Sequence, residues 1–228
     1  MNAATAHGVV AGPAGALVTA TDGPVSPIGL VLLCHPHPQH GGTMDNKVVQ
    51  TLARAFVALG YVAVRFNFRG VGGSEGAWDE GQGEVDDAQA VLQTVRTPGL
   101  PLVLGGFSFG GYVATQLAAR LADGSLAGGA AERLVLVAPA VSRFNVAPVP
   151  ANTLVIHGES DDVVPMSAAL DWARPQGLPL VVVPAAGHFF HGQLPLLKSL
   201  VTQAFAGSQS QSQSQPQPQS KTQPQPQA

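Results

Sequence analysis

A single serine stands among glycines near the middle of the chain. Ser108 lies in the stretch Gly-Phe-Ser-Phe-Gly, which begins at Gly106 and ends at Gly110. An apolar run of β-forming residues precedes the serine and a helical pattern follows it, so the serine falls where a strand turns into a helix. Such a turn exposes the hydroxyl above the sheet and leaves no space for side chains two residues away. It also directs the amide of Phe109 at an oxygen that becomes negatively charged. The pattern predicts a nucleophilic serine.

A serine hydroxyl is a weak nucleophile until a base removes its proton, so a histidine and an acid are expected elsewhere. The stretch HGESDDVVP follows the next-to-last predicted strand and contains Asp161. The stretch PAAGHFFHG follows the last predicted strand and contains His188. Both stretches lie at carboxyl ends of strands, where open parallel sheets place their sites. Together with Ser108, these residues predict a Ser-His-Asp triad.

Neighbouring residues offer alternatives for the acid and for the base. Asp161 fits the spacing H-G-x-x-D-x-x-V-P, whereas Asp162 would point elsewhere and Glu159 stands closer to the strand. His188 comes directly after the strand and its glycine, whereas His191 is expected to enter the last helix. We therefore predict Asp161 as the acid and His188 as the base.

The stretch CHPHPQHGG offers a second backbone donor and, as an alternative, a metal site. Proline has no N–H, so Pro36 and Pro38 cannot donate, and the amide of His37 between them is the leading candidate. The side chains of His35, His37 and His40 are the alternative, as metal ligands, but no second group of ligands accompanies them. We expect the His37 amide to complete an oxyanion hole, with no metal or other cofactor.

Strands and helices must alternate to position these residues. Buried strands are predicted within 28–35, 61–68, 100–107, 133–140, 152–159 and 178–185, and a weaker one at 16–21. Helices are predicted from a cap at Thr43 to Gly60, and at 84–95, 112–121, 167–173 and 194–205. This alternation predicts a mostly parallel sheet with helices on both faces.

The segment between the fourth and fifth of the six main strands is too short for a lid. Residues 141–152 contain two prolines and no helical period. We therefore expect an open cleft above the serine.

Composition limits the classes of function. The 228 residues, 45% of them hydrophobic, suffice for one sizeable core. A net charge of −3 gives no argument for binding nucleic acid or an anionic membrane. The single cysteine excludes an internal disulfide, and neither a signal peptide nor a membrane span is recognised. We expect a cytoplasmic protein with a hydrolase domain at 1–207 and a disordered Ser/Gln/Pro-rich tail at 208–228.

Four stretches resemble a known family. HPHPQHGGTMDNKVVQTLARAFVALGY, VRFNFRGVGGSEG, GGFSFGG and GHFFHG are similar to the small, lidless bacterial α/β-hydrolases, and the similarity extends from about Leu30 to His191. The resemblance implies an α/β-hydrolase fold without a lid domain. It also implies that the serine, aspartate and histidine named above are the triad, and that the two amides named above are the oxyanion donors. It leaves the substrate open.

These residues predict a serine hydrolase, with a carboxylesterase of small or soluble esters as the leading hypothesis. A thioesterase or an acyltransferase would use the same residues, and a non-catalytic binding module would not require all three. Haloalkane chemistry would need an aspartate in place of Ser108. The glycines of FNFRGVGGSEG lack the lysine of a phosphate loop, which argues against nucleotide binding. The oligomeric state does not follow from the sequence.

Overall fold

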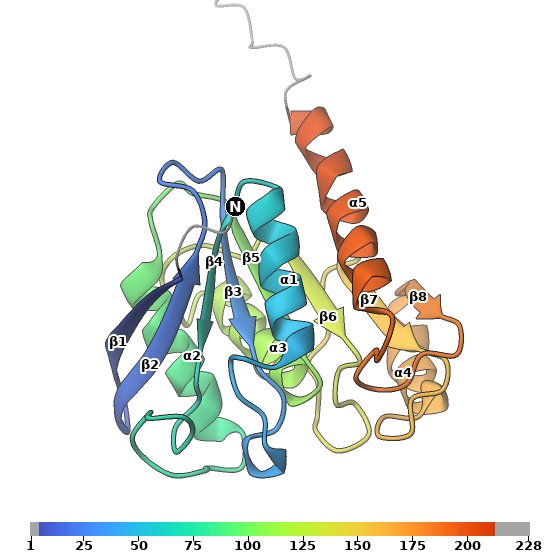
Figure 1. The fold of residues 1–228 in the computed structure, drawn as a ribbon, viewed down its shortest axis with the longest axis horizontal. Helices are drawn as coiled ribbons and strands as arrows, with labels where there is room; N and C mark the ends of the chain where they lie inside the picture. Colours follow the sequence, from blue (N-terminus) through green and yellow to red (C-terminus); the bar gives the residue numbers. More distant parts are fainter. Residues whose placement is uncertain (1–4, 213–228) are drawn as a thin grey trace, which may run out of the picture.

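The structure, a computed structural model, describes residues 5–212, with side chains to residue 206, and in this range eight strands form one sheet. The strands are β1 (Ala6–Gly12), β2 (Gly15–Asp22), β3 (Leu30–Cys34), β4 (Val62–Phe66), β5 (Leu102–Phe107), β6 (Arg133–Val137), β7 (Leu154–Gly158) and β8 (Leu180–Val183). Their order across the sheet is β1-β2-β4-β3-β5-β6-β7-β8 (Figure 1). β2 pairs antiparallel with β1 and with β4. All the other neighbouring pairs of this sheet are parallel. The predicted mostly parallel sheet is confirmed.

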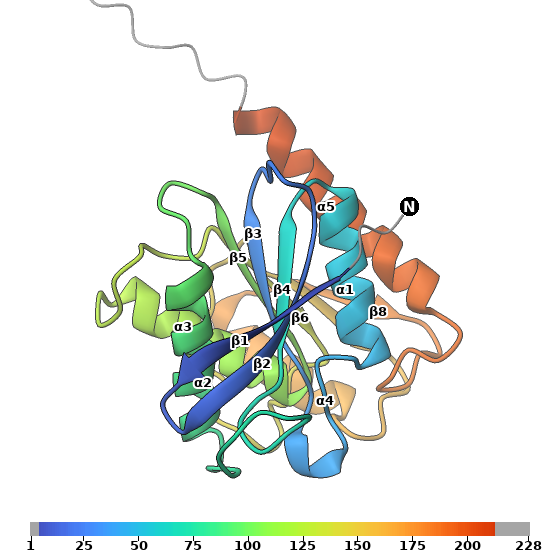
Figure 2. The ribbon, with the colours of Figure 1, turned by 60° about the vertical axis from the view of Figure 1, so that its left-hand side comes forward.

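Helices cover both faces of the sheet. They are α1 (Lys47–Ala58), α2 (Gln82–Val95), α3 (Phe109–Ala122), α4 (Met166–Ala173) and α5 (Leu194–Ser212), and two short 3-10 turns span Pro38–His40 and Arg174–Gln176. α1 and α5 lie side by side on one face, and α2 and α3 lie together on the other (Figure 1 and Figure 2).

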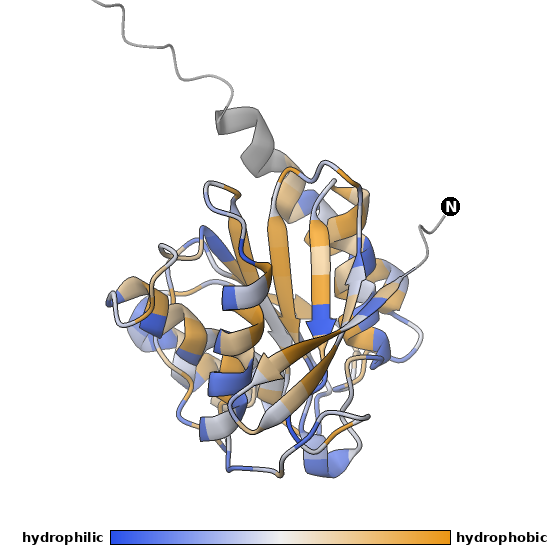
Figure 3. Cartoon of the chain, turned by 90° about the vertical axis from the view of Figure 1, so that its left-hand side faces the viewer, coloured by the Kyte–Doolittle hydropathy of each residue, from blue (hydrophilic) through white to orange (hydrophobic). Residues whose placement is uncertain are grey.

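The central strands are mostly apolar because each of their faces meets a helical layer. In β3, Leu30, Leu32 and Cys34 pack in the core beneath α2 and α3, whereas Val31 and Leu33 pack in the core beneath α1 and α5. Successive strand residues point to opposite faces, so burial on both faces produces a continuous apolar run. Figure 3 shows most of the length of the central strands in the hydrophobic colour, while the helices carry many hydrophilic residues.

Two boundaries differ from the sequence predictions. The first helix begins at Lys47, and its cap is Asn46, whose side chain accepts a hydrogen bond from the Val48 amide at 2.9 Å. The prediction of Thr43 as the cap is wrong, because a turn at residues 44–45 separates it from the helix. The helix after the serine begins at Phe109, three residues earlier than predicted, directly after the serine itself.

The ends of the described chain add two elements. The strand predicted at 16–21 is β2, and it pairs with β1, which the sequence analysis missed. β1 is an edge strand and most of its side chains are exposed, so it shows no apolar pattern. At the other end α5 continues to Ser212, and residues 213–228 of the predicted tail lie outside the described residues. Among the helices between residues 5 and 212, none is both long and apolar enough to span a membrane.

Candidate active site

Ser108 occupies a strained turn between β5 and α3. Its φ of 55° and ψ of −119° place a residue with a side chain in a region that normally favours glycine. Hydrogen bonds from the surrounding strands hold it there. The Ser108 amide donates to the carbonyl of Val137 at 3.0 Å, and the Ala140 amide donates to the carbonyl of Ser108 at 3.1 Å. The turn is therefore determined by the sheet as well as by its own sequence.

The glycines around Ser108 allow backbone segments to approach closely. A Cβ atom on Gly106 would lie 2.1 Å from the carbonyl oxygen of Gly110. A Cβ atom on Gly110 would lie 2.1 Å from the carbonyl oxygen of Cys34, at the end of β3. Both distances are far below van der Waals contact. The prediction that no side chain fits two residues from the serine is confirmed.

The structure brings three sequence-predicted side chains into one hydrogen-bonded chain. His188 Nε2 lies 3.0 Å from the Ser108 hydroxyl, and His188 Nδ1 lies 2.7 Å from Asp161 Oδ2. All three residues are buried, with exposed fractions of 7% for the serine, 6% for the aspartate and 3% for the histidine. They follow β5, β7 and β8 respectively, at one edge of the sheet. In this arrangement the imidazole can take a proton from the serine while the carboxylate orients the ring.

The alternative acids and base lie elsewhere. Asp162 and His191 are exposed, and the His191 ring contacts the ring of Phe189 at 5.8 Å. The Glu159 carboxylate accepts a hydrogen bond from the Ala185 amide at 2.9 Å. None of the three contacts the Ser108 hydroxyl in the described part of the chain.

The two amides predicted as oxyanion donors both border the cleft beside Ser108. His37 and Phe109 line this cleft, and their rings are 5.2 Å apart between centroids. Within residues 5–212, neither amide has a hydrogen-bond acceptor. Both are therefore free to donate to a substrate oxygen.

The cleft has a volume of about 300 Å³ and is formed by loops that follow five strands, β3, β5, β6, β7 and β8. Its lining consists of Pro36, His37, His40, Gly41, Gly42, Asn46, Ser108, Phe109, Ala140, Arg143, Phe144, Val163, Val164, His188 and Phe189. Most of these side chains are apolar or aromatic, as in pockets for small molecules.

A family model described as serine aminopeptidase, S33, matches residues 26–151, more than half of the chain. The chain belongs to this family of α/β serine hydrolases. A protein from Xanthomonas campestris, described as an α/β serine hydrolase without a lid, is 38% identical; the match covers 90% of this chain and 94% of that one, with a TM-score of 0.81. An α/β serine hydrolase homologue from Coxiella burnetii is also 38% identical, over 87% of this chain and 96% of that one, with a TM-score of 0.74.

An uncharacterized protein from Rickettsia prowazekii is 38% identical over 151 residues, 62% of this chain. The chain spans about 59% of the length of this curated relative. The prediction of a lidless α/β-hydrolase fold is confirmed. In this hydrolase the segment between β6 and β7 forms short turns at residues 141–143 and 151–152 within an otherwise irregular stretch, and Arg143 and Phe144 from this segment line the cleft.

Two amides and two histidines surround the Asp161 carboxylate. The Val163 and Val164 amides donate to Oδ1 at 2.9 Å and 2.7 Å. Burial opposes ionisation, but the hydrogen bonds from His188 and from these amides outweigh it and hold the pKa of Asp161 below its usual value. His157, which is fully buried, lies on the other side: its Nε2 is 2.9 Å from the Val164 carbonyl oxygen and 3.6 Å from Asp161 Oδ2. The sequence spacing alone does not predict this contact.

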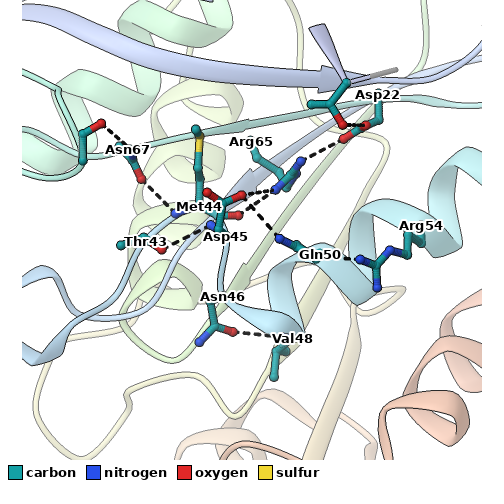
Figure 4. A network of polar contacts seen from close by, with 12 residues as sticks. Asp22, Thr43, Met44, Asp45, Asn46, Val48, Gln50, Arg54, Arg65 and Asn67 are labelled. Carbon is teal, nitrogen blue, oxygen red and sulfur yellow. Dashed lines mark hydrogen bonds and ion pairs between the residues drawn. The ribbon is translucent and has the colours of Figure 1, made fainter. Parts of the chain in front are cut away.

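Polar contacts hold the far end of the loop that carries His37. The Asn67 side chain accepts a hydrogen bond from the Met44 amide at 2.9 Å, and Arg65 donates to the Met44 carbonyl oxygen at 2.9 Å (Figure 4). Arg65 also forms ion pairs with Asp22 at 3.0 Å and Asp45 at 3.1 Å. The loop between β3 and α1 is therefore tied to the end of β4 and to β2.

Arg69 ties the turn after β4 to α2. Its guanidinium donates two hydrogen bonds to the Asp87 carboxylate, at 3.0 Å and 2.8 Å, and lies 3.6 Å from Asp79. Trp78, in the same segment, packs against the ring of His37 at 4.5 Å between centroids. The glycine-rich stretch FNFRGVGGSEG is thus tied to α2, and the segment that follows it contacts the ring of His37.

The three histidines considered as metal ligands are used differently. His35 is buried, with Nδ1 2.7 Å from the Pro36 carbonyl oxygen and Nε2 accepting a hydrogen bond from the Phe68 amide at 3.1 Å. Burial lowers the pKa of His35 to about 3. The rings of His37 and His40 contact each other at 4.6 Å between centroids. Across residues 5–212, no three side chains of histidine, cysteine, aspartate or glutamate are grouped to hold a metal ion.

Proposed function

We propose that this α/β serine hydrolase cleaves carboxylic esters of small, soluble substrates through an acyl-enzyme intermediate. One observation supports the proposal above all others: the continuous hydrogen-bonded chain from the Ser108 hydroxyl through His188 to Asp161, at the edge of an open cleft. A hydroxyl in contact with a neutral imidazole, whose other nitrogen donates to a carboxylate, is a nucleophile with its base in place.

The geometry supports a two-stage reaction. Ser108 Oγ attacks the ester carbonyl carbon while His188 Nε2 takes the hydroxyl proton. The carbonyl oxygen becomes negatively charged beside the amides of His37 and Phe109. His188 then gives the proton to the departing alcohol, which leaves the acyl group on Ser108. In the second stage, water attacks the acyl carbon while His188 Nε2 takes its proton. His188 then returns the proton to Ser108 Oγ, and the carboxylic acid is released.

The residues that line the cleft favour an ester substrate over a peptide, although the family model is described as a serine aminopeptidase. An aminopeptidase must bind a free ammonium group, which calls for a carboxylate near the nucleophile. In the described part of the chain the lining contains neither aspartate nor glutamate, and its one charged side chain other than histidine is the cationic Arg143. A thioester would follow the same steps as an ester, so both belong in the same assay.

The test combines covalent labelling with hydrolysis. A fluorophosphonate should label Ser108, identified by mass spectrometry of the peptides. Ser108→Ala should abolish labelling and reduce turnover of acyl esters of graded chain length by about 10⁴- to 10⁶-fold. Ser142→Ala is the matched control, because this serine is exposed in the segment beside the cleft. Unlabelled Ser108, or a Ser108→Ala variant that keeps a tenth of the activity, would contradict the proposal.

A further inference from the structure

The lining of the cleft includes the cationic side chain of Arg143. Besides histidines, Arg143 is the only titratable side chain among residues 5–206 that lines it. The chain as a whole has a formal net charge of −3, so a cationic cleft does not follow from the overall composition. A ligand carboxylate in the cleft would be attracted by Arg143, and no aspartate or glutamate of the described residues lines the cleft beside it.

Arg143 differs from every other arginine in the described part of the chain because its side chain has no hydrogen bond and no ion pair there. Each of the others donates to a carboxylate, an amide oxygen or a backbone carbonyl: Arg54, Arg65, Arg69, Arg96, Arg120, Arg133 and Arg174. Arginine presents a planar fork of donors that matches a carboxylate. The guanidinium of Arg143 is therefore available to a ligand.

The backbone fixes Arg143 close to the nucleophile. The Arg143 amide donates to the carbonyl of Ala140 at 3.2 Å, and Ala140 is itself hydrogen-bonded to the carbonyl of Ser108. Phe144, the next residue, packs against the rings of Phe109 at 5.0 Å and His37 at 6.0 Å between centroids. Burial lowers the pKa of His37, and the charges of His40 and Arg143 lower it further.

Arg143 lies where the acyl group of an ester would bind, and not where the alcohol would leave. The alcohol must leave beside His188 Nε2, because His188 gives it a proton. Phe189 directly follows His188 in the chain, the Val164 amide donates to Asp161, and both residues line the cleft. The acyl group must then extend away from His188, toward His37, Phe144 and Arg143.

We propose that the acyl group of the substrate carries a carboxylate, which Arg143 binds; the substrate is then a half-ester of a short dicarboxylic acid. This inference rests on the proposed ester hydrolysis. The carboxylate accepts hydrogen bonds from the guanidinium, and the methylene chain lies against Phe109 and Phe144. A cleft of about 300 Å³ has room for the half-ester of a short dicarboxylic acid and a short alcohol.

Two esters of nearly equal shape test whether the negative charge on the acyl group matters for hydrolysis. Monoethyl glutarate carries the carboxylate, and ethyl 4-carbamoylbutanoate carries a neutral carboxamide in its place. Ethanol release gives kcat/KM for each, and the ratio of the two values is the readout. We expect a ratio of roughly ten or more for the natural chain, falling about tenfold in Arg143→Gln, because a charge-assisted bidentate hydrogen bond is lost. Arg143→Lys should give an intermediate ratio, because lysine keeps the positive charge but cannot form the two parallel hydrogen bonds of a guanidinium.

Arg174→Gln is the matched control, because Arg174 is an exposed arginine on the same chain that lies outside the cleft lining. It should leave the ratio unchanged. A natural-chain ratio near one, or the same ratio in Arg143→Gln, would overturn the inference while leaving ester hydrolysis intact.

A second readout does not depend on turnover of these esters. Glutarate should slow fluorophosphonate labelling of Ser108 in the natural chain, and this protection should disappear in Arg143→Gln. Equal labelling with and without glutarate would overturn the inference. If Ser108 is not labelled at all, the proposed function and this inference both fail.

Discussion

Asp161 and Asp162 are adjacent in the chain, but their side chains lie in opposite environments. Asp161 is buried against His188, whereas Asp162 is exposed. We expect Asp161→Asn to lower kcat by about 10⁴-fold, because the amide can donate to His188 Nδ1 and then favours the tautomer that cannot accept the serine proton. Asp162→Asn should stay within a few-fold of the natural chain. Steady-state kinetics on one ester decides between them.

Both variants must be folded for this comparison, which circular dichroism and thermal unfolding can establish. Equal losses in two folded variants would mean that burial beside His188 does not determine which aspartate acts. A larger loss in Asp162→Asn would transfer the role of the acid to Asp162.

The turn from β5 to α3 depends on a close contact between α3 and the end of β3. Alanine in place of Gly110 gains about 0.8–1 kcal/mol of helix propensity. Its Cβ, however, would lie 2.1 Å from the Cys34 carbonyl oxygen, which is backbone and cannot rotate away. We expect overpacking to exceed the gain, so that Gly110→Ala lowers the free energy of unfolding by about 1–3 kcal/mol. Urea unfolding measures this change.

The same substitution should also lower kcat/KM at least tenfold, because it displaces the Phe109 amide from its place beside Ser108. Gly187→Ala is the matched control: Gly187 also adjoins a site residue, but its Cβ would meet only the Ser160 carbonyl oxygen, at 3.9 Å. If both variants unfold at the same urea concentration, the contact with β3 is not what requires glycine.

Acid should destabilise the whole molecule through histidines that are buried in the neutral form. Burial lowers the pKa of His35 to about 3, against about 6.5 when the chain is unfolded. Between these values only the unfolded chain binds the proton, so stability falls as the pH decreases below 6.5 and is fully retained above it. From pH 7.5 to pH 5 this single histidine should cost about 2 kcal/mol. Burial also lowers the pKa of His157 and of His37, which adds in the same direction.

Urea unfolding of the natural chain and of His35→Gln at pH 7.5 and pH 5 tests this account. Glutamine cannot take up a proton in this range, so the variant should lose less stability on acidification, although its stability at pH 7.5 is lower. His191→Gln is the control at an exposed position. An equal loss in all three chains would show that burial of His35 is not the cause.

Most of the sheet could be predicted because its strands are buried on both faces. β3 to β7 each carry an apolar run, which no solvated segment would need, and their alternation with helices determines a parallel sheet. β1 could not be predicted, because an exposed edge strand carries no such pattern. The start of α1 was misplaced because the turn before it is held by Asn67, a residue distant in the sequence.

The sequence by itself determined the types of residue in the site and their order along the chain. The glycines around Ser108, and the placement of Asp161 and His188 after strands, follow from local backbone requirements. Only the tertiary structure decided which neighbour faces the serine, because adjacent residues such as Asp161 and Asp162 differ in direction and not in type. It also decided that Arg143 lines the cleft with no hydrogen-bond or ion-pair partner for its side chain among the described residues, since the partners of an arginine come from segments that folding brings together.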